Sequence, residues 1–291
     1  MTTLKQAPPP SNIFPPSLNH CKILNIIFPS SAPLKVEYFK GIKILESEII
    51  KRYERNNKKI KLLVNSGNAS KEIYSLNEVF TFLSDTDEMR LKNLIKAFSS
   101  ADTSVVVCGR GGYGAIRLFR YFEQKEVMDQ IIEGLDKHRF MGFSDATFLH
   151  QVFRLEYARK HPGKHLITIH GPMPMTSFFS IPNRQRDIDL TFNAMVETEL
   201  NLAFPSVAGK VLCCCSEKIR GRLVGGSLTC LLACEGTKWS LEREEDIILF
   251  LEDINVSGLS TLLIKNPYNF TFLTQHYFRV SYSTGNAISI R

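Results

Sequence analysis

Long apolar runs, clustered basic residues and internal repeats are all missing from this 291-residue sequence. No apolar run approaches the roughly 18 residues that a membrane-spanning helix needs, so no membrane partner is predicted. The net charge is +7, but it is scattered, which does not indicate a nucleic-acid partner. Glycine and proline are scarce, with 17 and 13 residues, which excludes collagen-like and wholly disordered chains. The absence of repeats excludes a solenoid. We expect a soluble globular protein, long enough for about two domains.

The seven cysteines do not form a disulfide framework. Their number is odd, three of them stand together at 213–215, and no secretory signal pattern precedes them. Reduced thiols in a cytoplasmic protein are therefore predicted. No pair of well-spaced CxxC motifs could build a zinc site, so the favoured role is buried apolar packing. We expect no metal and no cofactor.

The chain is predicted to begin with a flexible tail and to continue as an α/β protein. Residues 1–20 are rich in proline and serine, and a solvated tail is favoured over a PxxP-type ligand. Short apolar runs then alternate with segments of helical periodicity, which predicts a parallel sheet flanked by helices. The strands are predicted at 22–28, 59–64, 103–108, 139–141 and 166–169, and the helices at 38–49, 89–98, 115–122, 127–135 and 146–158.

A loss of periodicity divides this α/β chain into two domains. Residues 21–175 form an N-terminal α/β domain, and residues 176–208 are predicted to be a linker, although 188–202 has a helix-like pattern. A smaller C-terminal α/β domain occupies residues 209–291. It is predicted to hold a strand near 210–215, a glycine-rich turn, a helix at 227–234 and a strand at 247–251. Its last 36 residues fit no pattern, so we expect this domain to be incomplete.

A glycine-rich loop, Gly109 to Gly114, follows a predicted strand and opens a helix. It satisfies GxGxxG, the pattern of a dinucleotide-binding loop. Such a site expects an acidic residue about 20 positions on, at the end of the next strand, whereas the window 130–133 lies in a predicted helix. Backbone N–H groups at a helix start also suit an anion or an oxyanion. A tight turn without a ligand is a further alternative.

A Gly-x-Ser turn, Gly142-Phe143-Ser144, joins a short predicted strand to a helix. This position places Ser144 on a sharp elbow above the sheet edge, which suits a nucleophile. The fifth position of the hydrolase elbow is Ala146 instead of glycine. Because serine before a helix is commonly an N-cap, that structural role is the alternative.

Five motifs follow one another along the chain: Arg110-Gly111-Gly112-Tyr113-Gly114, Gly142-Phe143-Ser144-Asp145, His170-Gly171-Pro172-Met173, Gly221-x-Leu223-x-Gly225-Gly226 with Gly236-Thr237, and Leu251-Glu252-Asp253. In this order and near this spacing they resemble the LD-carboxypeptidase family. These are serine peptidases that include muramoyltetrapeptide carboxypeptidases and microcin C immunity proteins. The resemblance extends from about Ile23 to Asn255.

The resemblance implies an active site between the two domains. Ser144 is similar to the nucleophile and Glu252 to the acid of a Ser–His–Glu triad, and the backbone N–H groups of Gly112 and Asp145 would form the oxyanion hole. The cleft would be lined by Arg110, Tyr113 and His170. The implied activity is hydrolysis of the L–D amide bond of cytoplasmic muropeptides, with release of terminal D-alanine, in peptidoglycan recycling. No metal is required, and a homodimer is what the family suggests.

The triad histidine has no clear counterpart in this sequence. Only His276 follows Glu252, and its surroundings, Thr274-Gln275-His276-Tyr277, do not match the Gly-His segment in which the family carries its base. The family pattern is lost after Asn255, as a truncation or a frame change near position 256 would produce. Two functions remain: an active carboxypeptidase, and a catalytically impaired peptide- or muropeptide-binding homologue that lacks the triad histidine.

Overall fold

Five parallel strands form the first sheet of the computed structural model, which describes residues 23–52, 60–65, 82–102, 104–176, 185–196, 222–241 and 247–253. In their order across the sheet the strands are β2 (Lys61–Asn65), β1 (Ile23–Ile27), β3 (Ser104–Cys108), β4 (Arg139–Gly142) and β5 (Ile169–His170). The predicted parallel α/β fold is confirmed. Because every pair is parallel, the carboxyl ends of all five strands lie at one edge.

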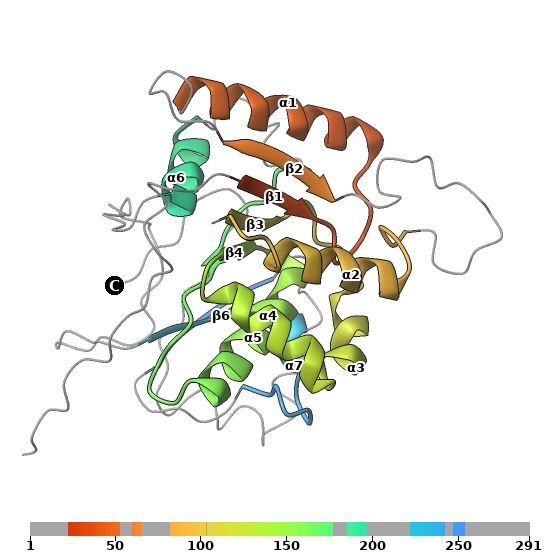
Figure 1. Ribbon diagram of the computed structural model, residues 1–291, viewed down its shortest axis with the longest axis vertical. Coiled ribbons are helices and arrows are strands. Elements are labelled where there is room, and N and C mark those ends of the chain that lie inside the picture. Colours follow the sequence, from red (N-terminus) through yellow and green to blue (C-terminus); the bar gives the residue numbers. More distant parts are fainter. Residues whose placement is uncertain are drawn as a thin grey trace, which may run out of the picture.

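Helices cover both faces of the first sheet. On one face lie α1 (Lys35–Arg52) and α6 (Gln185–Val196), and on the other lie α2 (Asp87–Phe98), α4 (Lys125–Leu135) and α5 (Thr147–Lys160) (Figure 1). Side chains of the central strand β3 alternate between these two faces. Val106 and Cys108 pack into the cluster with α2, α4 and α5, while Val105 and Val107 pack against α1 and α6. A strand covered on both faces is apolar throughout. The short helices η3 (Ala115–Leu118), α3 (Phe119–Phe122) and η4 (Ser144–Ala146) complete the first unit.

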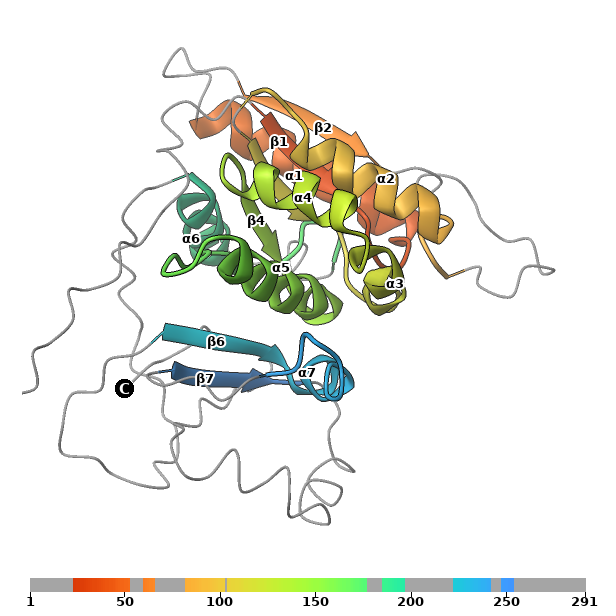
Figure 2. The same ribbon diagram turned by 60° about the horizontal axis from the view of Figure 1, so that its bottom comes forward.

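A second sheet of two parallel strands packs beside α5. It consists of β6 (Arg222–Ser227) and β7 (Ile247–Glu252), with α7 (Leu228–Ala233) between them in the chain. Figure 2 shows this small unit next to α5. Thr147, at the start of α5, is fully buried, and its Oγ1 accepts a hydrogen bond of 3.0 Å from the Ser227 N–H. The Gln151 side chain of α5 also donates to the Trp239 carbonyl at 3.1 Å. The helix that follows β4 therefore anchors the second sheet.

The prediction of a glycine-rich turn before residue 227 is wrong, because Gly225 and Gly226 belong to strand β6. A Cβ at Gly225 would stand 1.8 Å from the Phe250 carbonyl oxygen of β7, and a Cβ at Gly226 would stand 2.5 Å from Thr147 Oγ1. Both glycines also have positive φ, +153° and +142°. They let β6 approach β7 and α5 closely, a role that the sequence pattern does not separate from a turn.

Helix α6 occupies part of the segment predicted to be a linker. Its side chains Ile188, Phe192 and Met195 are buried and pack into the cluster beneath β1 and β3. Strand β5 begins at Ile169, three residues after the predicted start at 166. The predicted strand near 210–215, the tail 1–20 and residues 256–291 lie outside the described residues. None of the described helices has the length and apolar character that a bilayer crossing needs.

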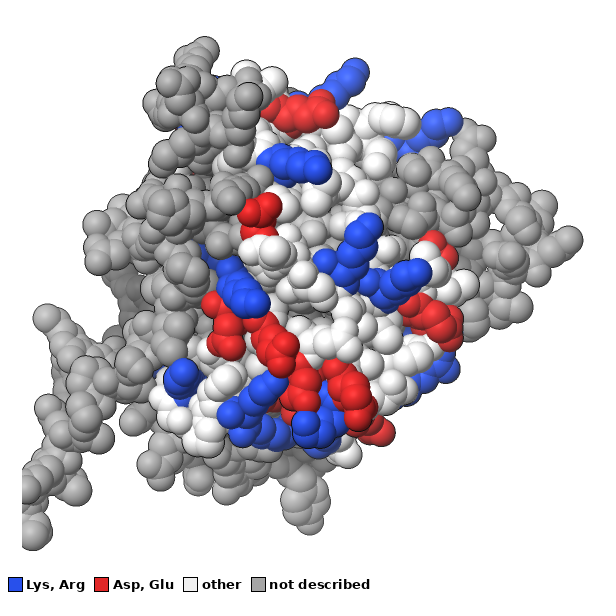
Figure 3. Space-filling view, viewed as in Figure 1, with Lys and Arg blue, Asp and Glu red and all other residues white. Residues whose placement is uncertain are grey.

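Charged side chains pair with one another on the described surface. Lysine, arginine, aspartate and glutamate intermingle on the face in Figure 3.

The buried Asp87 accepts hydrogen bonds from Arg117 at 2.9 Å and Arg120 at 3.0 Å, and it also pairs with Arg90. Burial alone would raise the pKa of Asp87, but the hydrogen bonds from Arg117 and Arg90 hold it below its ordinary value. This network joins α2 to the η3 and α3 segment.

Candidate active site

The loops that follow neighbouring strands meet at the carboxyl edge of the first sheet. The Gly109 N–H donates to the Ile27 carbonyl at 2.7 Å, which joins the loop after β3 to the end of β1. The Gly171 N–H donates to the Gly142 carbonyl at 3.0 Å, which joins the loop after β5 to the end of β4. This edge is where open α/β sheets bind their ligands.

Ser144 stands in the turn between β4 and α5. Its φ is +58°, and among the described residues no other residue except glycine has a positive φ. This conformation is unfavourable for a residue with a Cβ by about 1–2 kcal/mol. The N-cap positions of η4 and α5 are Phe143 and Ala146, and neither helix start has a side-chain cap hydrogen bond. The N-cap alternative for Ser144 is therefore wrong, and the turn has the strained geometry of an elbow.

The glycine-rich loop packs directly against this elbow. A Cβ at Gly111 would lie 3.2 Å from Ser144 Cβ, and a Cβ at Gly112, where φ is +100°, would lie 2.4 Å from Ser31 Oγ. A Cβ at Gly109 would lie 2.4 Å from the Phe28 ring. Close packing within the protein thus accounts for these glycines without a dinucleotide. Within the described residues the Gly112 N–H donates to no protein acceptor.

Asp145 ties the elbow to the segment that follows the glycine-rich loop. Its side chain is buried, and Oδ2 accepts a hydrogen bond of 2.8 Å from the Ala115 N–H at the start of η3. Burial raises the pKa of Asp145 above its ordinary value, although the hydrogen bond from Ala115 opposes that shift. The side chain therefore holds the turn in place, and the Asp145 backbone N–H is the group expected to serve an oxyanion.

His170 and Glu252 face each other where the two sheets meet. His170 ends β5 and Glu252 ends β7, and His170 Nε2 lies 3.5 Å from Glu252 Oε1. Their side chains are only 13% and 10% exposed. The ring of Phe143, which follows β4, and the ring of Phe250, in β7, have centroids 5.2 and 5.0 Å from that of the His170 ring. Because Phe143 precedes Ser144, this contact places the pair next to the elbow.

The end of β7 is held against α7 by Asp253. Its Oδ2 accepts hydrogen bonds from the Thr229 backbone N–H at 2.8 Å and from the Thr229 hydroxyl at 2.5 Å. In the same helix, Cys230 Sγ lies 3.8 Å from the Ser144 carbonyl oxygen. Burial raises the pKa of Cys230 to about 12, so this thiol stays protonated and acts as an apolar group. These contacts bring Glu252 and Ser144 to the same interface between the two sheets.

The remaining predicted cleft residues lie on the loop itself. Arg110 donates from Nη1 to Glu37 Oε2 of α1 at 3.0 Å and is partly exposed. Tyr113 is 47% exposed, and the centroid of its ring lies 5.9 Å from the centroid of the Phe82 ring. His276 lies outside the described residues.

His150 is a residue near the site that the sequence did not single out. It lies one turn into α5, where its Nε2 is 3.1 Å from the Gly142 carbonyl and its Nδ1 is 2.7 Å from Thr168 Oγ1. A carbonyl can only accept, so Nε2 carries the proton and the Thr168 hydroxyl donates to Nδ1. Burial lowers the pKa of His150 to about 3. In the sequence, the only sign of this residue is a histidine six positions after the elbow serine. Its contacts with Gly142 and Thr168 depend on how α5 packs against the sheet, so they are visible only in the structure.

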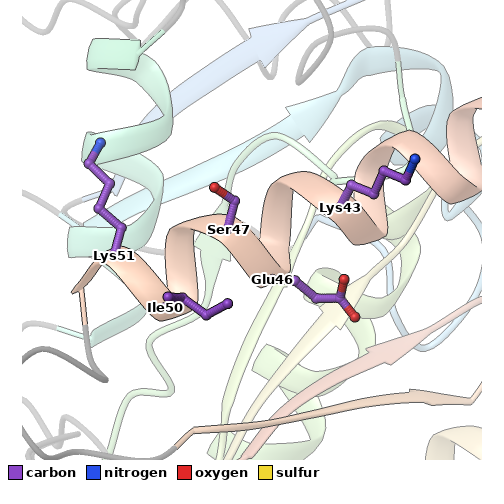
Figure 4. Close-up of a pocket in the computed structure, with 5 residues that line it drawn as sticks. All are labelled: Lys43, Glu46, Ser47, Ile50 and Lys51. Carbon is purple, nitrogen blue, oxygen red and sulfur yellow. The ribbon is translucent and has the colours of Figure 1, made fainter.

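Other features of the described residues offer no second centre. No three histidine, cysteine, aspartate or glutamate side chains in the described ranges are grouped so that they could hold a metal ion. Figure 4 shows a surface depression whose lining residues, Lys43, Glu46, Ser47, Ile50 and Lys51, all come from α1. Ligand pockets are concave and lined mainly by apolar and aromatic side chains, whereas this depression is open and four of its five lining residues are polar or charged. The elbow is therefore the better candidate.

Comparison with known proteins shows the family to which this chain belongs. The models of the LD-carboxypeptidase N-terminal domain and of the LD-carboxypeptidase C-terminal domain match residues 25–160 and 220–275, together about two thirds of the chain. The chain belongs to the LD-carboxypeptidase family. The second match continues beyond Asn255, where the motif resemblance ends in the sequence.

Individual relatives carry names from cell-wall metabolism. The murein tetrapeptide carboxypeptidase of Pseudomonas aeruginosa is 31% identical over 190 residues, which cover 60% of this chain and 53% of that protein. A Bacillus subtilis protein named "Probable murein peptide carboxypeptidase" is 27% identical over 262 residues, which cover 84% of this chain and 66% of that protein. The chain thus spans about half to two thirds of the length of the curated relatives that it matches.

Solved structures share the fold at low sequence identity. The microcin C7 self-immunity protein in complex with aspartyl sulfamoyl adenosine has a TM-score of 0.66 and 20% identity, over 93% of this chain and 80% of that chain. The muramoyltetrapeptide carboxypeptidase from Oxalobacter formigenes has a TM-score of 0.52 and 22% identity, over 79% of this chain and 65% of that chain. These likenesses confirm the two-part α/β architecture.

Proposed function

We propose that this protein is a serine carboxypeptidase that hydrolyses the L–D amide bond of muropeptides and releases terminal D-alanine. The observation that carries this proposal is the backbone of Ser144, which is held at a φ of +58° between β4 and α5. Strain of this kind is maintained where it presents a reactive side chain. The names of the murein carboxypeptidases among its relatives support the substrate class. We place the reaction in the cytoplasm, in peptidoglycan recycling.

The proposed reaction is an acyl transfer in two steps. Ser144 Oγ attacks the amide carbonyl carbon, its proton passes to a histidine base, and the Gly112 and Asp145 N–H groups stabilise the developing oxyanion. The base then protonates the amine of D-alanine, which leaves as the C–N bond breaks. A water molecule hydrolyses the resulting ester and restores the Ser144 hydroxyl. Glu252 holds the base in the tautomer that accepts the serine proton.

A second candidate function is muropeptide or peptide binding without turnover. Among the described residues no histidine nitrogen is hydrogen-bonded to Ser144 Oγ, which favours this alternative. Loss of a triad member lowers kcat by several orders of magnitude. A chain without a base would keep the loop and the elbow as a binding surface.

The test is incubation with L-Ala-D-Glu-diaminopimelate-D-Ala, with D-alanine release followed by mass spectrometry and binding by calorimetry. We expect release by the wild type and a decrease of at least about 10⁴-fold in Ser144→Ala. Ser99→Ala, a change at an exposed serine that ends α2, is the matched control and keeps wild-type activity. Binding without release by both wild type and Ser144→Ala would establish the second function. Absence of both binding and release would refute both.

A further inference from the structure

The pair formed by His170 and Glu252 contains buried polar atoms that have no hydrogen bond. Both ring nitrogens of His170 and Oε1 of Glu252 are buried without a partner within hydrogen-bond geometry. The closest approach, His170 Nε2 to Glu252 Oε1, is 3.5 Å. A buried polar atom without a hydrogen-bond partner is unfavourable, and here the orphaned Nε2 of His170 and the orphaned Oε1 of Glu252 face each other. Hydrogen bonds at catalytic sites are commonly long before substrate binds and shorten in the complex.

The orientation of the His170 ring is set by its surroundings. In the first sheet His170 is paired in register with Gly142, two residues before Ser144. The phenyl rings of Phe143 and Phe250 meet its ring edge to face, at interplanar angles of 72° and 70°. Aromatic contacts of this kind restrict ring rotation, so Nε2 keeps facing the end of β7.

Within the part of the chain that the structure describes, His150 is a second titratable group beside His170, and it is neutral. His150, from α5, lies 5.8 Å from the His170 ring between centroids. Its nitrogens are occupied by Gly142 and Thr168, and burial keeps its pKa at about 3. Glu252 from β7 is therefore the carboxyl group that faces His170 Nε2. Asp253, the next residue, is directed to Thr229 of α7.

We propose that His170 is the positioning residue for Glu252: its Nε2–H donates to Oε1 and fixes the carboxylate beside the Ser144 elbow. This inference rests on the proposed function and extends it. With Oε1 held by His170, the second carboxylate oxygen is left to orient the base that accepts the serine proton. Groups that orient a reacting group in this way act through geometry and touch neither the substrate nor the scissile bond.

The contact is tested first without substrate, by the imidazole ¹⁵N chemical shifts of His170 in the full chain. These shifts report which nitrogen carries the proton and whether it donates a hydrogen bond. We expect Glu252→Gln to move the His170 Nε2 signal, while Glu235→Gln, a change at an exposed carboxylate beyond α7, leaves it in place. Unchanged His170 shifts in folded Glu252→Gln would overturn the pairing.

The role is tested second by two substitutions at His170. Phenylalanine keeps the aromatic packing but removes the donor, and glutamine offers an N–H at the position of Nε2. We expect His170→Phe to lower kcat by about 10–100-fold with KM nearly unchanged, and His170→Gln to recover part of that loss. A purely structural role predicts the reverse order, with phenylalanine the milder change. Wild-type kcat in His170→Phe would overturn the positioning role.

The two tests separate this inference from the proposed function. A wild-type chain that releases no D-alanine overturns the proposed function, and with it any catalytic meaning of the pair. Unchanged ¹⁵N shifts overturn the pair alone, even if the wild type is active.

Discussion

Replacing Ser144 by glycine and by alanine separates the backbone strain of the elbow from the loss of its hydroxyl. Both variants remove Oγ, so both should be inactive. They differ in the backbone, because alanine keeps the Cβ that makes a φ of +58° unfavourable and glycine does not. Relief of that strain is about 1–2 kcal/mol, and the larger conformational entropy of glycine in the unfolded chain opposes it by about 0.5–1 kcal/mol. We expect Ser144→Gly to be more stable than Ser144→Ala by about 1 kcal/mol.

The assay is urea unfolding of both variants, with Ser99 as the control position. Ser99 ends α2 with an ordinary φ of −85°, and its hydroxyl is lost in both Ser99→Gly and Ser99→Ala. There glycine should be the less stable variant by about 0.5–1 kcal/mol. If Ser144→Gly is also less stable than Ser144→Ala, the elbow is not strained and the main support for a nucleophile at this position is lost.

Two further predictions concern the interface beneath the site. Thr147→Val leaves the buried Ser227 N–H without its acceptor, and we expect a loss of about 1–3 kcal/mol in the free energy of unfolding. A loss below about 0.5 kcal/mol would show that this contact does not hold the second sheet. Burial lowers the pKa of His150 from 6.5 to about 3, so the ring stays neutral in the folded protein over that range. The free energy of unfolding therefore has its full value above pH 6.5 and decreases as the pH falls toward 3, because there the unfolded chain binds a proton that the folded chain does not. The free energy of unfolding should change by about 1.4 kcal/mol per pH unit through this group. Chemical unfolding measured from pH 7 to 4 should show a shallower pH dependence in His150→Gln than in the wild type. Equal slopes would contradict this.

Local patterns predict much of the first domain correctly. Apolar runs such as 103–108 are strands because both faces of the sheet are covered, and Val105 to Cys108 divide between the two cores by simple alternation. The Gly-x-Ser pattern before a helix predicts an elbow at Ser144, since a short strand that leads straight into a helix requires a sharp turn. Five motifs in a fixed order also lead to the family that the domain matches show.

Long-range packing explains where local patterns fail. Gly225 and Gly226 are in a strand because β7 and α5 come too close for a Cβ, and these neighbours lie far away in the sequence. Helix α6 packs into the core of the first unit because its apolar side chains join those of α1 against one face of the first sheet. Nothing in residues 176–208 taken alone indicates that contact.

By itself the sequence determined the alternating α/β order, the family and the candidate residues Ser144 and Glu252, because these depend on local periodicity and on short motifs. Only the tertiary structure decided which of those residues meet. His170 lies beside Glu252, and Thr147 anchors β6, because a parallel sheet and a second sheet packed on α5 bring together residues about 80 positions apart. Proximity of that kind is set by how the strand ends align, which no local pattern records.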